Sequence, residues 1–188
     1  MWSFAGVRPL IDDGSGKPEA ATRGYSLELS PEDEGAPLLN VFGGKLTVYR
    51  HLAEDAVGML AGRLSMPSPA AWTGTEALPG GDFPAGEVDT LIDRIAARYP
   101  FLDPRTHRRL AHSYGTDSLA ILGDAETLAD CGEHFGHGLT AREVDHLFAK
   151  EWARTPDDVL WRRTKLGLRL DNGQVQALGR YLQAKQAA

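Results

Sequence analysis

A glycine pair followed by a lysine is the stretch of the chain best suited to chemistry. The run Leu38–Phe42 predicts a short buried strand, Gly43 and Gly44 follow it, and Lys45 precedes a predicted helix. Glycine lets a ligand approach the backbone closely. The first N–H groups of a helix lack internal partners and carry partial positive charge, to which Lys45 adds a full charge. Together these features predict a site that stabilises an anion.

The common nucleotide-phosphate motifs do not describe this segment. A phosphate loop of the Walker type would need glycine where Leu39 stands and Ser or Thr where Leu46 stands. The dinucleotide pattern G-x-G-x-x-G is absent from the chain. The spacing alone leaves two interpretations open, an anion site and a helix cap that only turns the chain.

A second cluster has the side chains of a metal site. Cys131, His134 and His137 are spaced three residues apart, and His107 or His112 could add a further nitrogen. Structural zinc sites usually use two or more cysteines, and this chain has one. We therefore expect no metal here and interpret the histidines as packed or solvated.

A basic run lies near the C-terminal end, beside Trp161. Its cations could contact nucleic acid or phospholipid, or they could pair with acids on a helix face. The formal net charge of −6 favours pairing and argues against a nucleic-acid partner. The members of the run are Arg162, Arg163, Lys165 and Arg169.

The elements that carry these residues fall into two unlike parts. In the first, Tyr25–Leu29 alternates as a half-buried strand does, and residues 46–63 have the apolar stripe of a helix. Residues 65–86 hold four of the eleven prolines and predict a connector.

The second part predicts a series of helices with strong end signals. Asp103 and Pro104 open one helix, and Thr140 and Glu143 form the pattern of a capping box ahead of another. Further helices are expected over 88–99, 117–122, from 155 onward and near the C-terminus, after a break at Asn172-Gly173.

An ordered set of short words resembles flavin-dependent glycerol-3-phosphate dehydrogenase of the aerobic, quinone-linked type, over nearly the whole chain. One such word would be weak, and the ordered set is highly specific. The words are Gly6–Leu10, Val41–Arg50, Leu78–Phe83, Tyr114–Thr116, Leu139–Val144, Glu151–Ala153 and Asp158–Leu168.

The resemblance implies an FAD enzyme that oxidises sn-glycerol 3-phosphate to dihydroxyacetone phosphate and passes electrons to quinone. It implies that Arg8 lines the substrate site, where a planar guanidinium suits a phosphate. It also implies that the flavin ring is wrapped by one segment, with Lys45 a candidate for the substrate site as well. That segment consists of Gly43, Gly44, Lys45, Leu46 and Thr47.

The resembling family carries a glycine-rich FAD motif in an N-terminal domain, and this chain has none. We therefore expect the chain to lack its FAD domain as partner, to bind no flavin and to be inactive alone. At position 24 the chain has Gly24 where the family has an acidic residue, beside Arg23.

The expected fold is mixed. Residues 1–64 should be a small α+β remnant of the FAD and substrate domain, 65–86 a linker, and 87–188 an all-α helical domain. The resemblance places the parent enzyme in the cytoplasm, peripheral at the inner face of the membrane. No apolar run has transmembrane length, and the N-terminus lacks the pattern of a secretory signal. A non-catalytic helical interaction module is the alternative, and the sequence leaves a homo-oligomer open.

Overall fold

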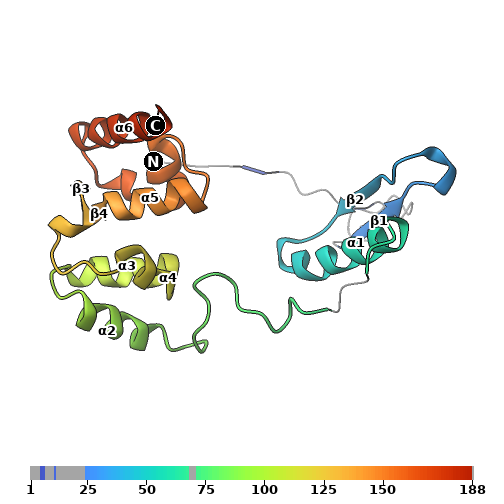
Figure 1. Ribbon diagram of the computed structural model, residues 1–188, viewed down its shortest axis with the longest axis horizontal. Helices are drawn as coiled ribbons and strands as arrows, with labels where there is room; N and C mark the ends of the chain where they lie inside the picture. Colours follow the sequence, from blue (N-terminus) through green and yellow to red (C-terminus); the bar gives the residue numbers. More distant parts are fainter. Residues whose placement is uncertain (1–4, 7–10, 12–23, 68–70, 188) are drawn as a thin grey trace. The chain divides into compact units, whose positions relative to one another are not determined.

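The computed structural model describes residues 5–6, 11, 24–67 and 71–187, so Arg8 and Arg23 lie outside the described residues. The chain divides into two compact units, Met1–Glu76 and Ala77–Ala188, each with its own elements (Figure 1). The two units are described separately below.

The first unit pairs a β-hairpin with one helix. Strands β1 (Tyr25–Leu29) and β2 (Leu39–Gly43) are antiparallel, with Leu27 opposite Val41, and a 3₁₀ turn at Glu32–Glu34 lies between them. Helix α1 (Tyr49–Arg63) continues from a 3₁₀ turn at Leu46–Val48. The predicted strands and helix are therefore present.

Two side-chain contacts fasten α1 to the hairpin. In the middle of α1, Asp55 Oδ2 accepts from the Tyr25 hydroxyl at 2.5 Å. Near its end, Arg63 donates to the carbonyl oxygens of Ser30 at 2.9 Å and Pro31 at 3.1 Å, where the chain leaves β1. Polar contacts at the middle and the end of α1 thus join the helix to the hairpin.

The first unit has almost no core of its own. Among its described hydrophobic residues only Ala61 is buried. The run Leu38–Phe42 was predicted to be buried, and this is wrong for the present chain, since Leu38 is 61% exposed, Val41 48% and Phe42 45%. An apolar pattern specifies burial only if a partner surface is present, and a two-stranded hairpin with one helix does not supply one.

The second unit is helical, as predicted. Helix α3 (Pro104–Tyr114) lies against α2 (Val88–Arg98) and α4 (Asp117–Leu122), and α4 also meets α5 (Ala141–Lys150). The C-terminal helix α6 (Asn172–Ala187) packs on a short strand, β3 (Figure 1). A continuous apolar core joins these helices and includes Ile95, Leu110, Val144, Leu160 and Leu178.

A small hairpin interrupts the predicted all-α domain. Strands β3 (His134–Gly136) and β4 (Leu139–Thr140) are antiparallel, and the residues between them, His137 and Gly138, both have positive φ, at 50° and 76°. Positive φ at both central residues is typical of a tight hairpin turn. The strands are too short to show an alternating pattern, which is why the sequence did not predict them.

Several helix ends confirm the end signals read from the sequence. The Asp103 carboxylate accepts from the N–H groups of Arg105 and Thr106, each at 3.0 Å. Hydrogen bonds from the Thr106 hydroxyl and the Thr106 N–H lower the pKa of Asp103. Thr155 and Asp158 exchange side-chain bonds with each other's N–H groups, as a capping box does.

Two other end signals were interpreted wrongly. Thr140 makes no side-chain capping bond, so Thr140 and Glu143 are no capping box. Asn172-Gly173 does not break the chain, because α6 begins at Asn172, capped by reciprocal bonds between Asp171 and Gln174 at 2.9 and 3.0 Å. The Asp171 carboxylate therefore satisfies the N–H group of Gln174, which has no partner inside the first turn of the helix.

Part of the predicted connector belongs to the second unit. The Gly80 carbonyl accepts from Thr116 N–H at 3.0 Å, and the Thr116 hydroxyl donates to Asp82. A Cβ added at Gly80 would collide with the Tyr114 carbonyl, and one at Gly115 with the Gly80 carbonyl. Glycine is needed at both positions because two backbones pass in direct contact.

Glu143, which does not form a capping box, belongs to a buried polar cluster between α3 and α5. Arg109 donates to both Glu143 oxygens at 2.5 and 2.7 Å and to the Gly138 carbonyl at 3.0 Å, and the Tyr114 hydroxyl donates to Glu143 Oε1 at 2.7 Å. The Glu143 side chain is 2% exposed and that of Arg109 14%. Burial and the neighbouring carboxylate raise the pKa of Tyr114, which keeps it a donor.

Replacing Glu143 by Gln should destabilise the second unit by about 3–5 kcal/mol, since the Arg109 charge would stay buried without its counter-charge. Urea unfolding of the whole chain, followed by circular dichroism, measures this. Arg162→Gln is the control, because it breaks the exposed Arg162–Asp158 pair and should cost at most about 1 kcal/mol. Equal effects of the two changes would contradict the cluster's role.

Candidate functional site

The chain turns sharply between β2 and the helical segment that starts at Leu46. Gly43 and Gly44 have φ of 71° and 97°, and Gly44 N–H donates to the Gly24 carbonyl at 2.7 Å. A Cβ added at Gly43 would lie 2.8 Å from Gly24 O and 3.0 Å from Ile11 Cγ1. Both glycines are therefore required by the turn itself, whatever lies outside it.

The side chain of Lys45 plays no part in holding the turn together. The Lys45 backbone is extended and its carbonyl accepts from Val48 N–H at 3.1 Å, while its exposed side chain makes no hydrogen bond or ion pair with any described residue. The neighbouring Leu46 is 89% exposed, and Thr47 is exposed too. The turn thus presents an amine and two outward side chains side by side.

The local charge favours an anion at this point. Neither the 3₁₀ turn at 46–48 nor the first turn of α1 carries an acidic residue, so Lys45 adds to the partial positive charge of the helix start. The nearby Arg50 is occupied, since it donates to Glu54 at 3.2 Å and to Thr73 at 3.4 Å. This donor set fits a phosphate or the electron-rich edge of a reduced flavin.

The structure therefore brings Gly43, Gly44, Lys45, Leu46 and Thr47 together in one turn, as their contiguity requires. Arg8, the predicted substrate ligand, lies outside the described residues.

The first unit also has a hollow that the sequence did not predict. An open hollow of about 580 Å³ lies between β1 and α1, lined by Tyr25, Leu27, Glu54, Asp55, Gly58 and Met59. The hydrogen bond from Tyr25 to Asp55 raises the pKa of the phenol. The residues that line it are separated by about thirty positions, so no local motif could have revealed it.

A second hollow, of about 560 Å³, lies beside α2 and α4. Asp82, Glu87, Asp117 and Arg94 give it a mixed-charge lining over an apolar floor that includes Leu91. The words Leu78–Phe83 and Tyr114–Thr116 meet next to it, so their first structural role is backbone packing.

The candidate metal ligands have separate surroundings. Cys131 is buried, with Sγ 4.0 Å from the Thr127 carbonyl, and burial raises the pKa of its thiol. His134 and His137 are exposed, and His107 is buried with Nε2 2.9 Å from the Tyr99 carbonyl. Within the described residues, no three His, Cys, Asp or Glu side chains are placed to hold a metal ion.

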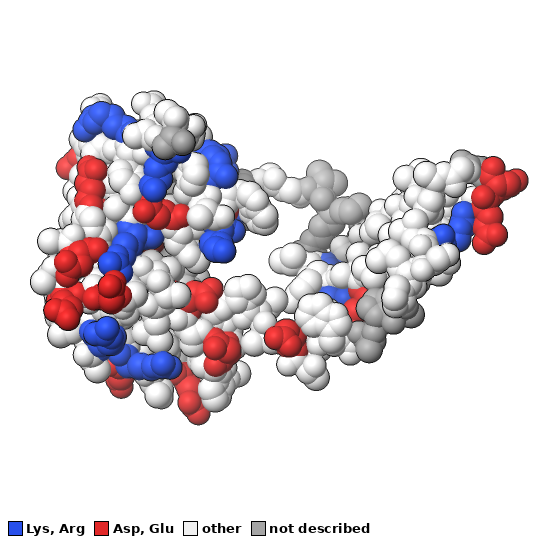
Figure 2. All heavy atoms as spheres, viewed as in Figure 1, with Lys and Arg blue, Asp and Glu red and all other residues white. Residues whose placement is uncertain are grey.

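The basic run pairs with acids, as predicted for Arg162 and Arg163. Arg162 lies 3.0 Å from Asp158, and Arg163 lies 3.0 Å from Glu151. Figure 2 shows acidic and basic side chains intermixed over the face of the second unit that it presents. None of the described helices is long and apolar enough to cross a membrane.

The fold is that of a helical domain that follows, in the sequence, a unit of one hairpin and one helix with almost no core of its own. A family model described as the C-terminal domain of alpha-glycerophosphate oxidase matches residues 71–184. The chain belongs to this family.

Characterised relatives extend the similarity to nearly the whole chain. It is 49% identical over 185 residues to a glycerol-3-phosphate dehydrogenase of Pseudomonas aeruginosa and 45% identical over 182 residues to the aerobic glycerol-3-phosphate dehydrogenase of Escherichia coli. It is 40% identical over 174 residues to a D-erythritol 1-phosphate dehydrogenase of Brucella abortus. These matches cover 98%, 97% and 93% of this chain, but only 36%, 36% and 34% of the relatives.

Replacing Gly43 by Ala should weaken the hairpin, because a Cβ there meets the Gly24 carbonyl and the positive φ is strained. Amide hydrogen exchange should show faster exchange at Gly44 and across β2. Gly58→Ala is the matched control, since nothing lies within 4 Å of the added Cβ in the middle of α1. It should stabilise the helix by about 0.5–1 kcal/mol. Slower exchange in both variants would refute the account of Gly43.

Proposed function

We propose that this chain is the C-terminal part of an FAD-dependent glycerol-3-phosphate dehydrogenase that passes electrons to quinone. The observation that carries the proposal is the exposed Lys45 amine at the helix start, which no described residue neutralises. The similarity to two glycerol-3-phosphate dehydrogenases over nearly the whole chain supports it.

In this proposal the residues of the turn contribute position and charge. The flavin, when bound, supplies the two-electron acceptor. Gly43 and Gly44 hold the turn that aims Lys45, Leu46 and Thr47 outward. The Lys45 ammonium and the first N–H groups of the helix stabilise negative charge at that face. Arg8 binds the phosphate of the substrate through its planar guanidinium.

The substrate is proposed to be sn-glycerol 3-phosphate, oxidised to dihydroxyacetone phosphate. The relative from Brucella abortus is named for D-erythritol 1-phosphate, which is also a polyol phosphate. Arg8 and Lys45 address the phosphate and developing charge that such substrates share, so these two residues do not choose between them. The higher identities to the glycerol-3-phosphate enzymes favour the shorter polyol.

Two further features of the parent follow from this chemistry. Quinone dissolves in the bilayer, so the parent enzyme would work as a peripheral protein at the inner face of the membrane. The chain alone should be colourless and inactive, because most of the residues that bind the flavin would lie in the part of the parent enzyme that this chain does not cover.

A helical interaction module is the second candidate. The exposed apolar residues of the helical unit favour it, since exposed apolar surfaces often meet a partner; they include Leu78, Leu128, Trp152 and Leu168. Under the leading proposal the same surface meets the rest of the oxidoreductase.

A chimera tests the leading proposal. The present chain replaces the matching C-terminal 185 residues of the Pseudomonas aeruginosa relative, and flavin content and glycerol-3-phosphate-dependent quinone reduction are measured. We expect a yellow, active protein. A chimera that is folded but colourless and inactive would overturn the proposal, as would a yellow preparation of the isolated chain.

Within an active chimera, Lys45→Ala should lower kcat/KM about 10²–10³-fold, the usual cost of losing one donor to developing charge. Lys45→Arg should restore part of this activity, because it keeps the charge. Lys150→Ala removes an exposed lysine at the end of α5 and should leave kcat/KM unchanged. Unaltered kinetics in Lys45→Ala would remove the turn from the active site.

A further inference from the structure

Trp152 occupies a backbone position that normally belongs to glycine. It follows Glu151, the residue that caps the end of α5, and has φ of 57°, in the left-handed region. Glycine is the usual residue at this point after a helix because it has no Cβ to clash, and a bulky side chain there is uncommon. The chain therefore holds a large aromatic residue where a smaller one would be less strained.

The backbone on both sides of Trp152 is firmly fixed. Ala153 is buried, and its N–H donates to the Leu147 carbonyl at 3.0 Å. Arg163 donates to the Glu151 carbonyl at 2.7 Å, and Arg154 donates to the Ala153 carbonyl at 2.9 Å. The strained position is thus part of a rigid loop.

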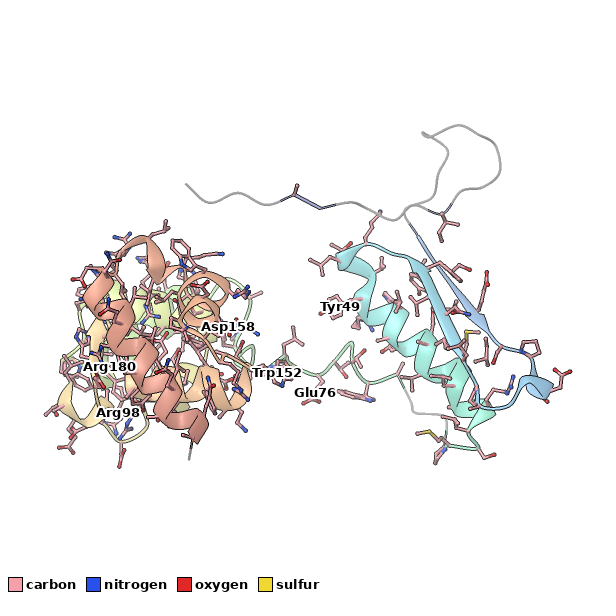
Figure 3. The ribbon with its side chains drawn as sticks, turned by 90° about the horizontal axis from the view of Figure 1, so that it is seen from above. Tyr49, Glu76, Arg98, Trp152, Asp158 and Arg180 are labelled. Atoms are coloured by element: carbon pink, nitrogen blue, oxygen red, sulfur yellow. The ribbon has the colours of Figure 1, made fainter. Side chains whose placement is uncertain are left out.

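The indole of Trp152 is nevertheless left outside. Its side chain is 80% exposed, and it makes no hydrogen bond or ring contact with a described residue. By contrast, Trp161 is packed against the core and Tyr181 contacts Phe135. Figure 3 labels Trp152 on the helical unit. The second unit therefore gains little packing energy from this residue to offset the backbone strain.

A rigid, exposed Trp has the properties of an interface anchor. Trp is enriched among the residues that dominate binding energy, and a pre-fixed backbone lowers the entropy lost on docking. Arg154 and Arg163 are spent on internal carbonyls and Glu151, so Lys150 is the exposed cation near Trp152. One lysine adds only about 1 kcal/mol of attraction to an anionic membrane. An apolar protein surface is the better match.

We propose that Trp152 is the anchor by which the helical unit docks on the flavin-bearing part of the longer oxidoreductase. This rests on the proposed function. The chain spans only 36% of the length of the Pseudomonas aeruginosa relative, so a body almost twice its size accompanies the matched region there. The anchor fits a surface carried in the same protein, which would cover the indole permanently.

The test compares Trp152→Gly in the isolated chain and in the chimera. In the isolated chain, removal of the strain should raise the thermal midpoint of the helical unit by about 3–6 °C. In the chimera, the same change should lower the temperature at which flavin fluorescence is released by about 5 °C or more, because the anchor is lost. Opposite signs in the two proteins distinguish a docking residue from a structural one.

His137→Gly is the matched control. His137 is also exposed, also has positive φ, at 50°, and lies in the β3–β4 turn of the same unit. His137→Gly should raise the thermal midpoint of the isolated chain and should not lower the temperature at which the chimera releases its flavin. Trp152→Phe should keep most of the docking, since an aromatic ring remains.

Three results would overturn the inference. The first is a lower thermal midpoint for Trp152→Gly than for the unaltered isolated chain. The second is an unchanged flavin-release temperature in the Trp152→Gly chimera. The third is that the unaltered isolated chain self-associates or binds vesicles and the Trp152→Gly chain does not. The last would assign the anchor to a second copy or to vesicles of phosphatidylglycerol and phosphatidylethanolamine. If the unaltered chimera were folded but free of flavin, the proposed function would fail first, whatever the sign of the effect in the isolated chain.

Discussion

The ion pair between Arg109 and Glu143 lies where three parts of the helical unit meet. Arg109 comes from α3 and Glu143 from α5, and the Gly138 carbonyl at the tip of the β3–β4 hairpin accepts from the same guanidinium. Two charges out of water are tolerated only when most of their polar atoms are bonded. One atom, Arg109 Nε, is buried without a partner among the described residues. The cluster therefore selects one arrangement of the three segments more than it adds net stability.

The two units differ in where their stability comes from. The second unit has a continuous core and its own buried polar cluster, so its helices can be specified internally. The first unit relies on contacts such as Arg63 with the Ser30 and Pro31 carbonyls, while its apolar residues face outward. That contrast agrees with a chain that belongs to a C-terminal domain family and spans about a third of its relatives. It also explains why the turn at Lys45 has a defined geometry while the described residues supply only one side of a binding site.

Features set by a few neighbouring residues could be predicted from the sequence. Asp103 caps α3 and Thr155 pairs with Asp158 because both arrangements close within three or four residues. Glu143 looked like a capping residue, but Arg109 and Tyr114, 34 and 29 positions away, compete for its carboxylate. The turn at Gly43–Thr47 could be located because strand, glycine pair and helix follow in order. Its function could not be read from spacing, since a turn and an anion site need the same glycines. The strained Trp152 left no signal, because its conformation depends on Ala153 reaching back to Leu147.

The hairpin of the first unit has one more consequence. Leu38, Val41 and Phe42 form a nearly continuous apolar stretch on an accessible strand, with no charged residue or proline among 38–42 to interrupt it. Exposed strands of this kind recruit further strands of the same kind. When the chain is made without the rest of its relatives' length, this strand is therefore a site at which copies of the chain can associate. A lysine introduced at position 41 would act as a gatekeeper against aggregation without touching the helical unit.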